Sequence, residues 1–229
     1  MHLSKSSYGI SPGQKQVSLS KLRKSGNPDT ILSMKTLILE TATEKGLIVL
    51  AENGSPLAVK PLTGGPGLSK SLALEVKNLL TSYSFAPDSI AVGTGPGSYT
   101  GIRVGAALAK SLAFGWQIPL IGFCSLIAFA PSDQYTVLID ARIGGFYVLH
   151  PSSSFEASAV LLSLSAAESE LKDRPLLASP HPELIQKRLA LPGNWAETSP
   201  DPDKLSILAH TLLLKEDSTP LTLAYLSCP

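Results

Sequence analysis

The glycine-rich stretch from Ser89 to Arg103, with the helix that it opens, constrains the fold more than any other part of the sequence. It starts as an apolar run at residues 90–92 and continues into a loop with three glycines and a proline, Gly93-Thr-Gly-Pro-Gly97. Glycine adopts backbone conformations that other residues avoid, and proline stiffens the turn. Ser98 or Thr100 then follows as a cap for the first helical turn. The stretch predicts a strand that turns sharply into a helix.

The start of this helix fits two interpretations. Free amides and the positive end of the helix dipole favour bound anions, whereas the same loop also serves simply to turn a strand into a helix. Arg103, one turn into the helix, would either contact a phosphate or pair with an acid such as Glu44. On the first interpretation, the candidate nucleotide- or anion-binding residues are Gly95, Gly97, Ser98, Thr100 and Arg103.

One face of the helix, which is expected to run to Phe114, carries only small residues. They recur every fourth position, as Gly101, Gly105, Ala109 and Ala113. Glycine inside a helix costs about 1 kcal/mol relative to alanine, so two of them on one face indicate that another backbone comes very close. That backbone belongs either to the chain's own sheet or to a helix of a partner protein, and a second copy of the chain could use the same face.

Two hairpins about one hundred residues apart resemble each other. An apolar run that ends in an acid, Met34–Glu40, is followed by a turn and a returning run at 47–51. The run that ends at Asp140 is followed in the same way by 146–150. This internal repeat predicts a duplicated α/β fold with two mixed-sheet halves. We expect a first half at 34–133, with an amphipathic helix at 68–82, and a smaller second half at 134–229, with one strand near 175–178 and helices near 183–191 and 203–216.

Composition and charge exclude several classes of protein. Residues 34–229 carry 14 basic and 17 acidic side chains, which argues against strong RNA binding by this chain alone. No apolar run reaches the roughly 18 residues that cross a membrane. Two distant cysteines favour a reducing, cytoplasmic compartment. Residues 1–33, with five basic residues and one acid, are expected to be disordered, either as a translated leader before Met34 or as a transit peptide.

Common catalytic and cofactor motifs are missing. The four histidines are far apart in sequence and form no metal-binding pair on one helix, so metalloprotease chemistry is rejected. A Rossmann loop would need glycine where Thr100 stands, and no Gly-Lys-Ser/Thr of a P-loop is present. A serine nucleophile needs a base, and no histidine lies near Ser98 in the sequence.

The glycine-rich motif Gly93–Arg103, together with Leu39–Thr43 and Asp140–Arg142, resembles the TsaB (YeaZ) family of tRNA threonylcarbamoyladenosine biosynthesis. The resemblance runs from Met34 to about Tyr147. It implies the two-domain fold of actin, Hsp70 and sugar kinases. It also implies a non-catalytic subunit that pairs with the catalytic paralogue TsaD and, depending on nucleotide, with the ATPase TsaE. That assembly transfers a threonylcarbamoyl group to the adenosine next to the anticodon, so this chain would meet tRNA only through the complex.

The resemblance also implies where pairing occurs, because the family pairs through two helices of its first half. Here they correspond to residues 68–82 and 99–114. The expected partner-binding residues are Leu68, Leu72, Val76, Gly101, Gly105, Ala109 and Ala113. No cofactor is assigned to this chain, and ATP or ADP at the subunit interface is left open.

One departure from the family argues against catalysis by this chain. The family usually has Asp where this sequence has Glu40, and the additional methylene would misplace a water at a nucleotide phosphate. The alternative function is a stand-alone ATP-dependent kinase or ATPase of the same superfold, which needs Glu40 and Asp140 to face a nucleotide between the halves. A third option is a module that binds nucleotide without hydrolysing it.

Overall fold

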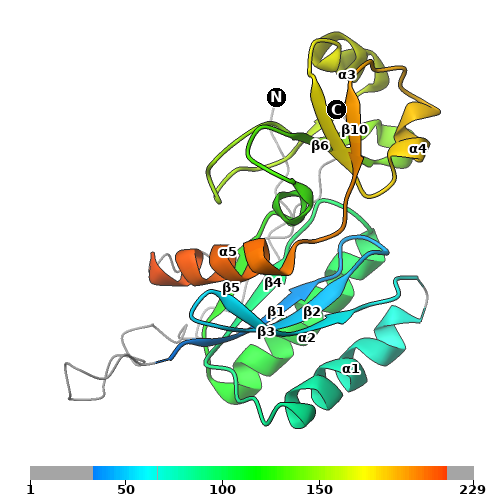
Figure 1. The fold of residues 1–229 in the computed structure, drawn as a ribbon. Helices are drawn as coiled ribbons and strands as arrows, with labels where there is room; N and C mark the ends of the chain where they lie inside the picture. Colours follow the sequence, from blue (N-terminus) through cyan, green and yellow to red (C-terminus); the bar gives the residue numbers. More distant parts are fainter. Residues whose placement is uncertain (1–32, 66, 216–229) are drawn as a thin grey trace, which may run out of the picture.

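Two five-stranded mixed sheets form the framework of the protein (Figure 1). The computed structural model describes residues 33–65 and 67–215. The first sheet has the order β3-β2-β1-β4-β5 and the second the order β10-β9-β6-β7-β8. The strands are β1 (Lys35–Glu40), β2 (Leu47–Glu52), β3 (Ser55–Pro61), β4 (Ser89–Gly93), β5 (Leu120–Phe123), β6 (Thr136–Asp140), β7 (Phe146–Leu149), β8 (Val160–Leu162), β9 (Leu176–Ser179) and β10 (Asn194–Glu197).

The two halves repeat one topology. In each half, the first three strands are antiparallel, and the first strand pairs in parallel with the fourth, β1 with β4 and β6 with β9. Each half also places its helices at the same points of the chain. The helices are α1 (Leu68–Ser82), α2 (Tyr99–Trp116), α3 (Leu164–Leu171), α4 (Pro182–Gln186) and α5 (Pro202–Leu214), with the short 3-10 helices η2 (Ser125–Phe129) and η3 (Arg142–Gly144). The predicted duplicated α/β fold is confirmed.

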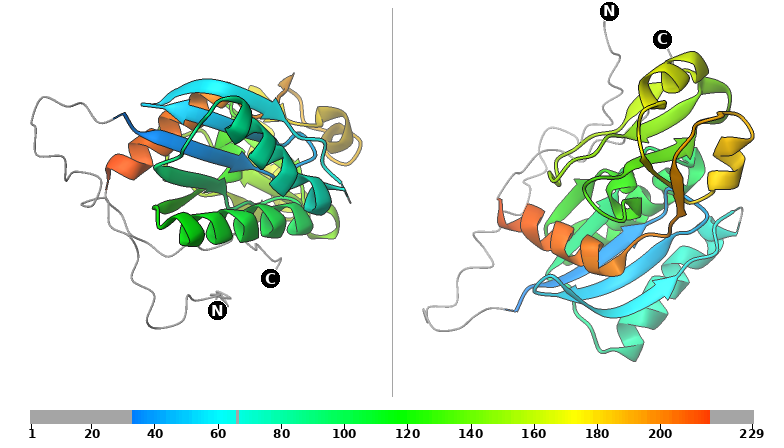
Figure 2. Two further views of the ribbon diagram at one scale, coloured as in Figure 1. Left: turned by 90° about the horizontal axis from the view of Figure 1, so that it is seen from below. Right: turned by 45° about the horizontal axis from the view of Figure 1, so that its top comes forward.

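Two helical segments cross between the halves. The helix η2 follows β5 of the first sheet but packs against β6 and β7 of the second. The helix α5 follows β10 but packs across the first sheet, on the face opposite to α1 and α2 (Figures 1 and 2). A single apolar cluster therefore includes residues from both halves, such as Ile38 and Val49 of the first sheet, Phe129 of η2, Val137 of β6 and Leu205 of α5.

The sequence explains the main elements of the first half. The strands β1 and β2 are apolar throughout because both faces of the first sheet are covered, and Leu37 to Leu39 have no exposed surface. The helix α1 buries Leu68, Leu72 and Val76, which recur at helical spacing on its inner side. With the inner side of α2, these three residues form a second apolar cluster against β1, β2 and β4.

The second half is richer in elements than the sequence suggested. The expected strand near 175–178 is β9, and the expected helix near 203–216 is α5, described up to Leu214. The helix expected at 183–191 ends already at Gln186, and β8, α3 and β10 were not expected. The expectation of disorder at 1–33 falls almost wholly outside the described residues. No helix in the described ranges is long and apolar enough to span a membrane.

Candidate functional site

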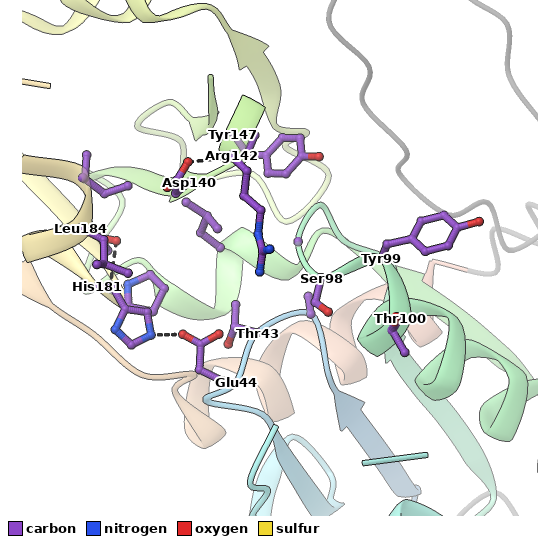
Figure 3. A pocket seen from close by; sticks show the side chains of 17 residues that line it. Thr43, Glu44, Ser98, Tyr99, Thr100, Asp140, Arg142, Tyr147, His181 and Leu184 are labelled. Carbon is purple, nitrogen blue, oxygen red and sulfur yellow. Dashed lines mark hydrogen bonds and ion pairs between the residues drawn. The ribbon is translucent and has the colours of Figure 1, made fainter. Parts of the chain in front are cut away.

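A cleft of about 590 Å³ lies between the two halves. Four turns form it: the β1–β2 turn and the start of α2 from the first half, and the β6–β7 turn and the start of α4 from the second (Figure 3). Its polar lining residues are Thr43, Glu44, Ser98, Tyr99, Thr100, Asp140, Arg142, Tyr147, Ser179 and His181. Ile139, Leu184 and Ile185 add apolar surface, so the cleft combines hydroxyl, acidic and basic groups with an apolar part.

The start of α2 lies at the cleft. Of the two candidate caps, Ser98 is the one used, because its hydroxyl accepts a hydrogen bond from the Gly101 amide at 3.3 Å. The Ser98 amide donates to the Ala42 carbonyl at 2.7 Å, which fixes α2 to the β1–β2 turn. Gly97, Ser98 and Thr100 line the cleft, whereas Gly95 is buried behind them.

The arginine that lines the cleft is Arg142, which the site prediction did not include. The predicted Arg103 lies outside the lining and stacks over the ring of Tyr99, with 4.8 Å between its guanidinium and the ring centroid. Arg142 comes from the β6–β7 turn, and its side chain points into the cleft toward Ser98 (Figure 3). In the sequence, only its place in the motif Asp140–Arg142 drew attention to this arginine. Which arginine faces α2 depends on how the two halves pack, and the sequence does not show that packing.

The acids at the cleft are already paired. Glu44 forms an ion pair with His181 of the second half. The neighbouring Lys45 reaches across in the same direction, 2.7 Å from Glu197. Asp140 lies in the lining and pairs with Arg188. The contacts of Glu44 and Lys45 join the two halves beside the cleft.

Glu40 does not belong to the cleft. Its side chain is completely buried, and one carboxylate oxygen accepts a hydrogen bond from the Ala42 amide at 2.7 Å. Burial raises the pKa of Glu40 to about 7, although backbone hydrogen bonds, chiefly from Ala42, oppose the shift. A stand-alone kinase or ATPase would need Glu40 and Asp140 to face one nucleotide. The structure contradicts that requirement, because only Asp140 lines the cleft.

The small-residue face of α2 is covered by this chain and is not an open docking surface. A Cβ atom added to Gly101 would collide with the carbonyl oxygen of Thr41, and one added to Gly105 with the Thr41 hydroxyl. That hydroxyl donates to the Gly101 carbonyl at 2.9 Å. Ala109 and Ala113 are buried in the cluster beneath the helix. Of the two neighbours that the sequence left open, the structure shows the chain's own β1 and its turn.

The same correction applies to the contacts expected from α1. Leu68, Leu72 and Val76 are each 5% exposed or less and are used by the core. The apolar side chains that do face outward are others, which the sequence reasoning missed: Leu74 of α1, and Tyr99, Phe114 and Trp116 of α2, between 41% and 64% exposed. The sequence did contain a sign of them, because they are large apolar residues at helix positions outside the buried face.

The described residues contain no group of three or more histidine, cysteine or acidic side chains placed to hold a metal ion. The cleft offers a nucleotide only part of a site. Hydroxyls of Ser98 and Thr100 and the Arg142 guanidinium suit a phosphate, but Glu40 is enclosed and Asp140 is tied to Arg188. The cleft therefore fits anion binding better than hydrolysis.

Comparisons with known proteins show which family this chain resembles. A family model described as TsaD, tRNA N6-adenosine threonylcarbamoyltransferase, matches residues 61–212. The tRNA threonylcarbamoyladenosine biosynthesis protein TsaB of Escherichia coli is 32% identical over 50% of this chain and 53% of its own length. TsaB of Bacillus subtilis is 31% identical over 58% of this chain and 68% of its own length. The chain thus spans about half the length of the E. coli and Haemophilus influenzae relatives.

Solved structures show the same fold. A protein from Pseudomonas aeruginosa with similarity to peptidase YeaZ superposes with a TM-score of 0.69 at 20% identity, covering 84% of this chain and 99% of that one. YeaZ from the same organism gives a TM-score of 0.66 at 23% identity, covering 79% and 93%. With the matched family model and the relative from B. subtilis, the conclusion is that this chain belongs to the TsaB (YeaZ) family.

Proposed function

We propose that this chain is a non-catalytic subunit in tRNA threonylcarbamoyladenosine biosynthesis, and that it pairs with and activates the TsaD-type catalytic paralogue. The observation that carries the proposal is the match to TsaB proteins, whose names place them in this pathway. The enclosed Glu40 supports a role without chemistry of its own, since of the two acids that end β1 and β6 only Asp140 lines the cleft. On this proposal, a TsaE-type ATPase and tRNA meet the chain within the assembled complex.

The outward faces of α1 and α2 are the proposed pairing surface. The two helices lie together on one side of the first sheet (Figure 2). Leu74 on α1 is 58% exposed and Phe114 on α2 is 64% exposed. Large exposed apolar side chains on two neighbouring helices are candidates for a protein–protein contact. The proposal thus keeps the two helices implied by the resemblance and moves the contact from their inner to their outer faces.

Co-purification with the TsaD-type paralogue of the same cell tests this surface. Leu74→Glu and Phe114→Glu each place a charge on the proposed contact and should abolish co-purification. Ile207→Glu is the matched control, because Ile207 is 50% exposed on α5, which covers the opposite face of the sheet. Circular dichroism should show all three variants folded. Retention of the paralogue by both helix variants would contradict the proposed surface.

Binding of a nucleotide without hydrolysis is the second candidate function. The observation that favours it is Arg142, whose guanidinium points into the cleft opposite the start of α2. Arginine and helix N-terminal amides together suit phosphate groups. Calorimetry with ADP, with and without the paralogue, measures this directly, and Arg142→Gln should abolish any heat of binding. Unchanged binding by that variant would place the nucleotide elsewhere, for example at the subunit interface.

A further inference from the structure

Glu40 is the only charged side chain in the core of the described residues. Its oxygen Oε1 accepts the Ala42 amide at 2.7 Å, but Oε2 is buried and forms no hydrogen bond of normal geometry within the described chain. An ionised carboxylate is costly in such a place, whereas a neutral carboxylic acid is tolerated. The folded structure thus favours Glu40 with a proton bound.

The position of this carboxyl group couples it to the glycine loop. A Cβ atom at Gly93 would overlap Oε2 and approach the Ser125 hydroxyl, so the glycine leaves room for both groups. Ser125 in turn holds the loop, because its amide donates to the Gly95 carbonyl at 2.9 Å and its hydroxyl accepts the Gly95 amide at 3.1 Å. The carboxyl group therefore lies where β1, the glycine loop and η2 meet.

No described charged group compensates a negative charge at this point. Burial is the main cause of the raised pKa, and the Ala42 amide, the nearby Ser125 hydroxyl and the Thr41 amide oppose it. The titratable neighbour is the thiol of Cys124, whose own pKa is raised by burial and stays above the neutral range. The charged residues of the adjoining turn, Glu44 and Lys45, are paired with the second half.

We propose that Glu40 is a buried proton-binding site that switches the glycine loop between two conformations as it gains and loses its proton. With its proton, the carboxyl group rests between Gly93 and Ser125 as observed. Without it, Oε2 requires a donor, and the Ser125 hydroxyl on the same side of Gly93 must turn its proton toward Oε2. Because this hydroxyl also accepts the Gly95 amide, Gly93 and Gly95 shift with it. The start of α2 follows the loop directly, so its first turn moves with the switch.

Nuclear magnetic resonance of the full chain between pH 5.5 and 8.5 tests the switch. The amide signals of Gly93 and Gly95 should shift with a common midpoint near 7, as the pKa of Glu40 requires. The shift should vanish in Glu40→Gln. It should persist in Asp140→Asn, the matched acid at the end of the equivalent strand β6. It should also persist in His181→Gln, which removes the histidine at the neighbouring cleft.

Ser125→Ala gives a second measurement that keeps Glu40 in place. Because the Ser125 hydroxyl lowers the pKa of Glu40, its loss should move the midpoint of the Gly93 and Gly95 shifts to higher pH. The proposal is overturned if these amides do not titrate in the wild type, if they titrate equally in Glu40→Gln, or if Ser125→Ala leaves the midpoint unchanged.

Discussion

At the end of β1 and of β6, two carboxylates make the same backbone contact but reach different surroundings. Glu40 accepts the Ala42 amide at 2.7 Å, and Asp140 accepts the Arg142 amide at 2.7 Å, each two residues further along the chain. Asp140 remains at the cleft, whereas the additional methylene of Glu40 carries its second oxygen under the glycine loop beside Gly93. Of these two acids, only Asp140 is therefore placed to meet a ligand in the cleft.

Stability should depend on pH through Glu40. The pKa of this acid is about 7 in the folded chain against 4.5 as a free side chain. Between these values the folded state binds the proton more tightly, so the contribution of Glu40 to stability is fully present below pH 4.5 and is lost as the pH rises through 7. The contribution is about 3 kcal/mol by linkage. Urea unfolding at pH 5, 6, 7 and 8 measures it.

Glu40→Gln is the control for this dependence, because glutamine keeps the shape and cannot ionise. Other groups titrate equally in both proteins, so the difference between them isolates Glu40. The free energy of unfolding of the variant should exceed that of the wild type at pH 8, and the gap should close toward pH 5. Parallel curves for the two proteins would mean that Glu40 does not titrate within this range.

A pair of glycines on α2 provides a test of the close approach to β1. Gly105→Ala should destabilise the protein by about 1–3 kcal/mol, because the new methyl group collides with the Thr41 hydroxyl. Gly115→Ala is the matched control in the same helix, since its added Cβ would meet no other described part of the chain within 4 Å. It should be neutral or stabilise by up to about 1 kcal/mol. Equal effects in thermal unfolding would show that helix propensity alone decides both.

The sequence predicted the local role of single residues, but it did not predict which distant part of the chain each residue faces. The helix cap at Ser98 could be predicted, because a hydroxyl at a helix start accepts a free backbone amide. The neighbour of Gly105 could not be predicted, because the spacing shows that a backbone comes close and does not show whose backbone it is. Arg103 and Arg142 differ in the same way, since their places relative to the cleft depend on how two distant turns meet.

At the scale of elements, the length of a helix or strand decided whether the sequence could predict it. The helices α1, with 15 residues, and α2, with 18, extend over several turns, so their apolar period is readable. The strand β8 has only three residues, and β10 has two partly buried and two exposed residues. Neither offers enough alternation to distinguish a strand from a loop. The outer face of a helix is also harder to interpret than its inner face, because packing does not constrain it.

Charge on α1 leads to a prediction about the proposed pairing surface. The helix exposes Lys70 and Lys77, and its one acid, Glu75, lies 3.6 Å from Lys60 of β3. If this face meets the paralogue, Lys70→Glu with Lys77→Glu should slow association and weaken it about tenfold or more at low salt, since exposed charges steer encounter. Lys172→Glu, an exposed lysine after α3, is the control. Surface plasmon resonance at two salt concentrations would reveal equal affinities if α1 lies outside the contact.

At the scale of the whole molecule, the two halves repeat a topology but do not close their cores separately. The halves exchange helical segments. The helix η2 comes after the first sheet in the chain and covers the second, whereas α5 comes after the second sheet and covers the first. The resulting apolar cluster contains Ile38 of β1, Val137 of β6 and Leu205 of α5 together. The repeat was visible in the sequence, because two hairpins share one pattern. The exchange of helical segments was not visible, since the apolar pattern of a helix does not show which sheet the helix covers.

The exchange predicts that the first half will not fold alone. A chain ending at residue 133 keeps all strands of the first sheet with α1 and α2 but loses α5, which covers the face that carries Ile38 and Val49. Apolar sheet surface without cover favours an expanded or associated state. The fragment should bind a hydrophobic dye and show no cooperative transition in scanning calorimetry, whereas the full chain should unfold in one transition, because a shared core couples its halves. A sharp transition of the fragment with native near-ultraviolet circular dichroism would show that each half is stable alone, and that α5 only joins them.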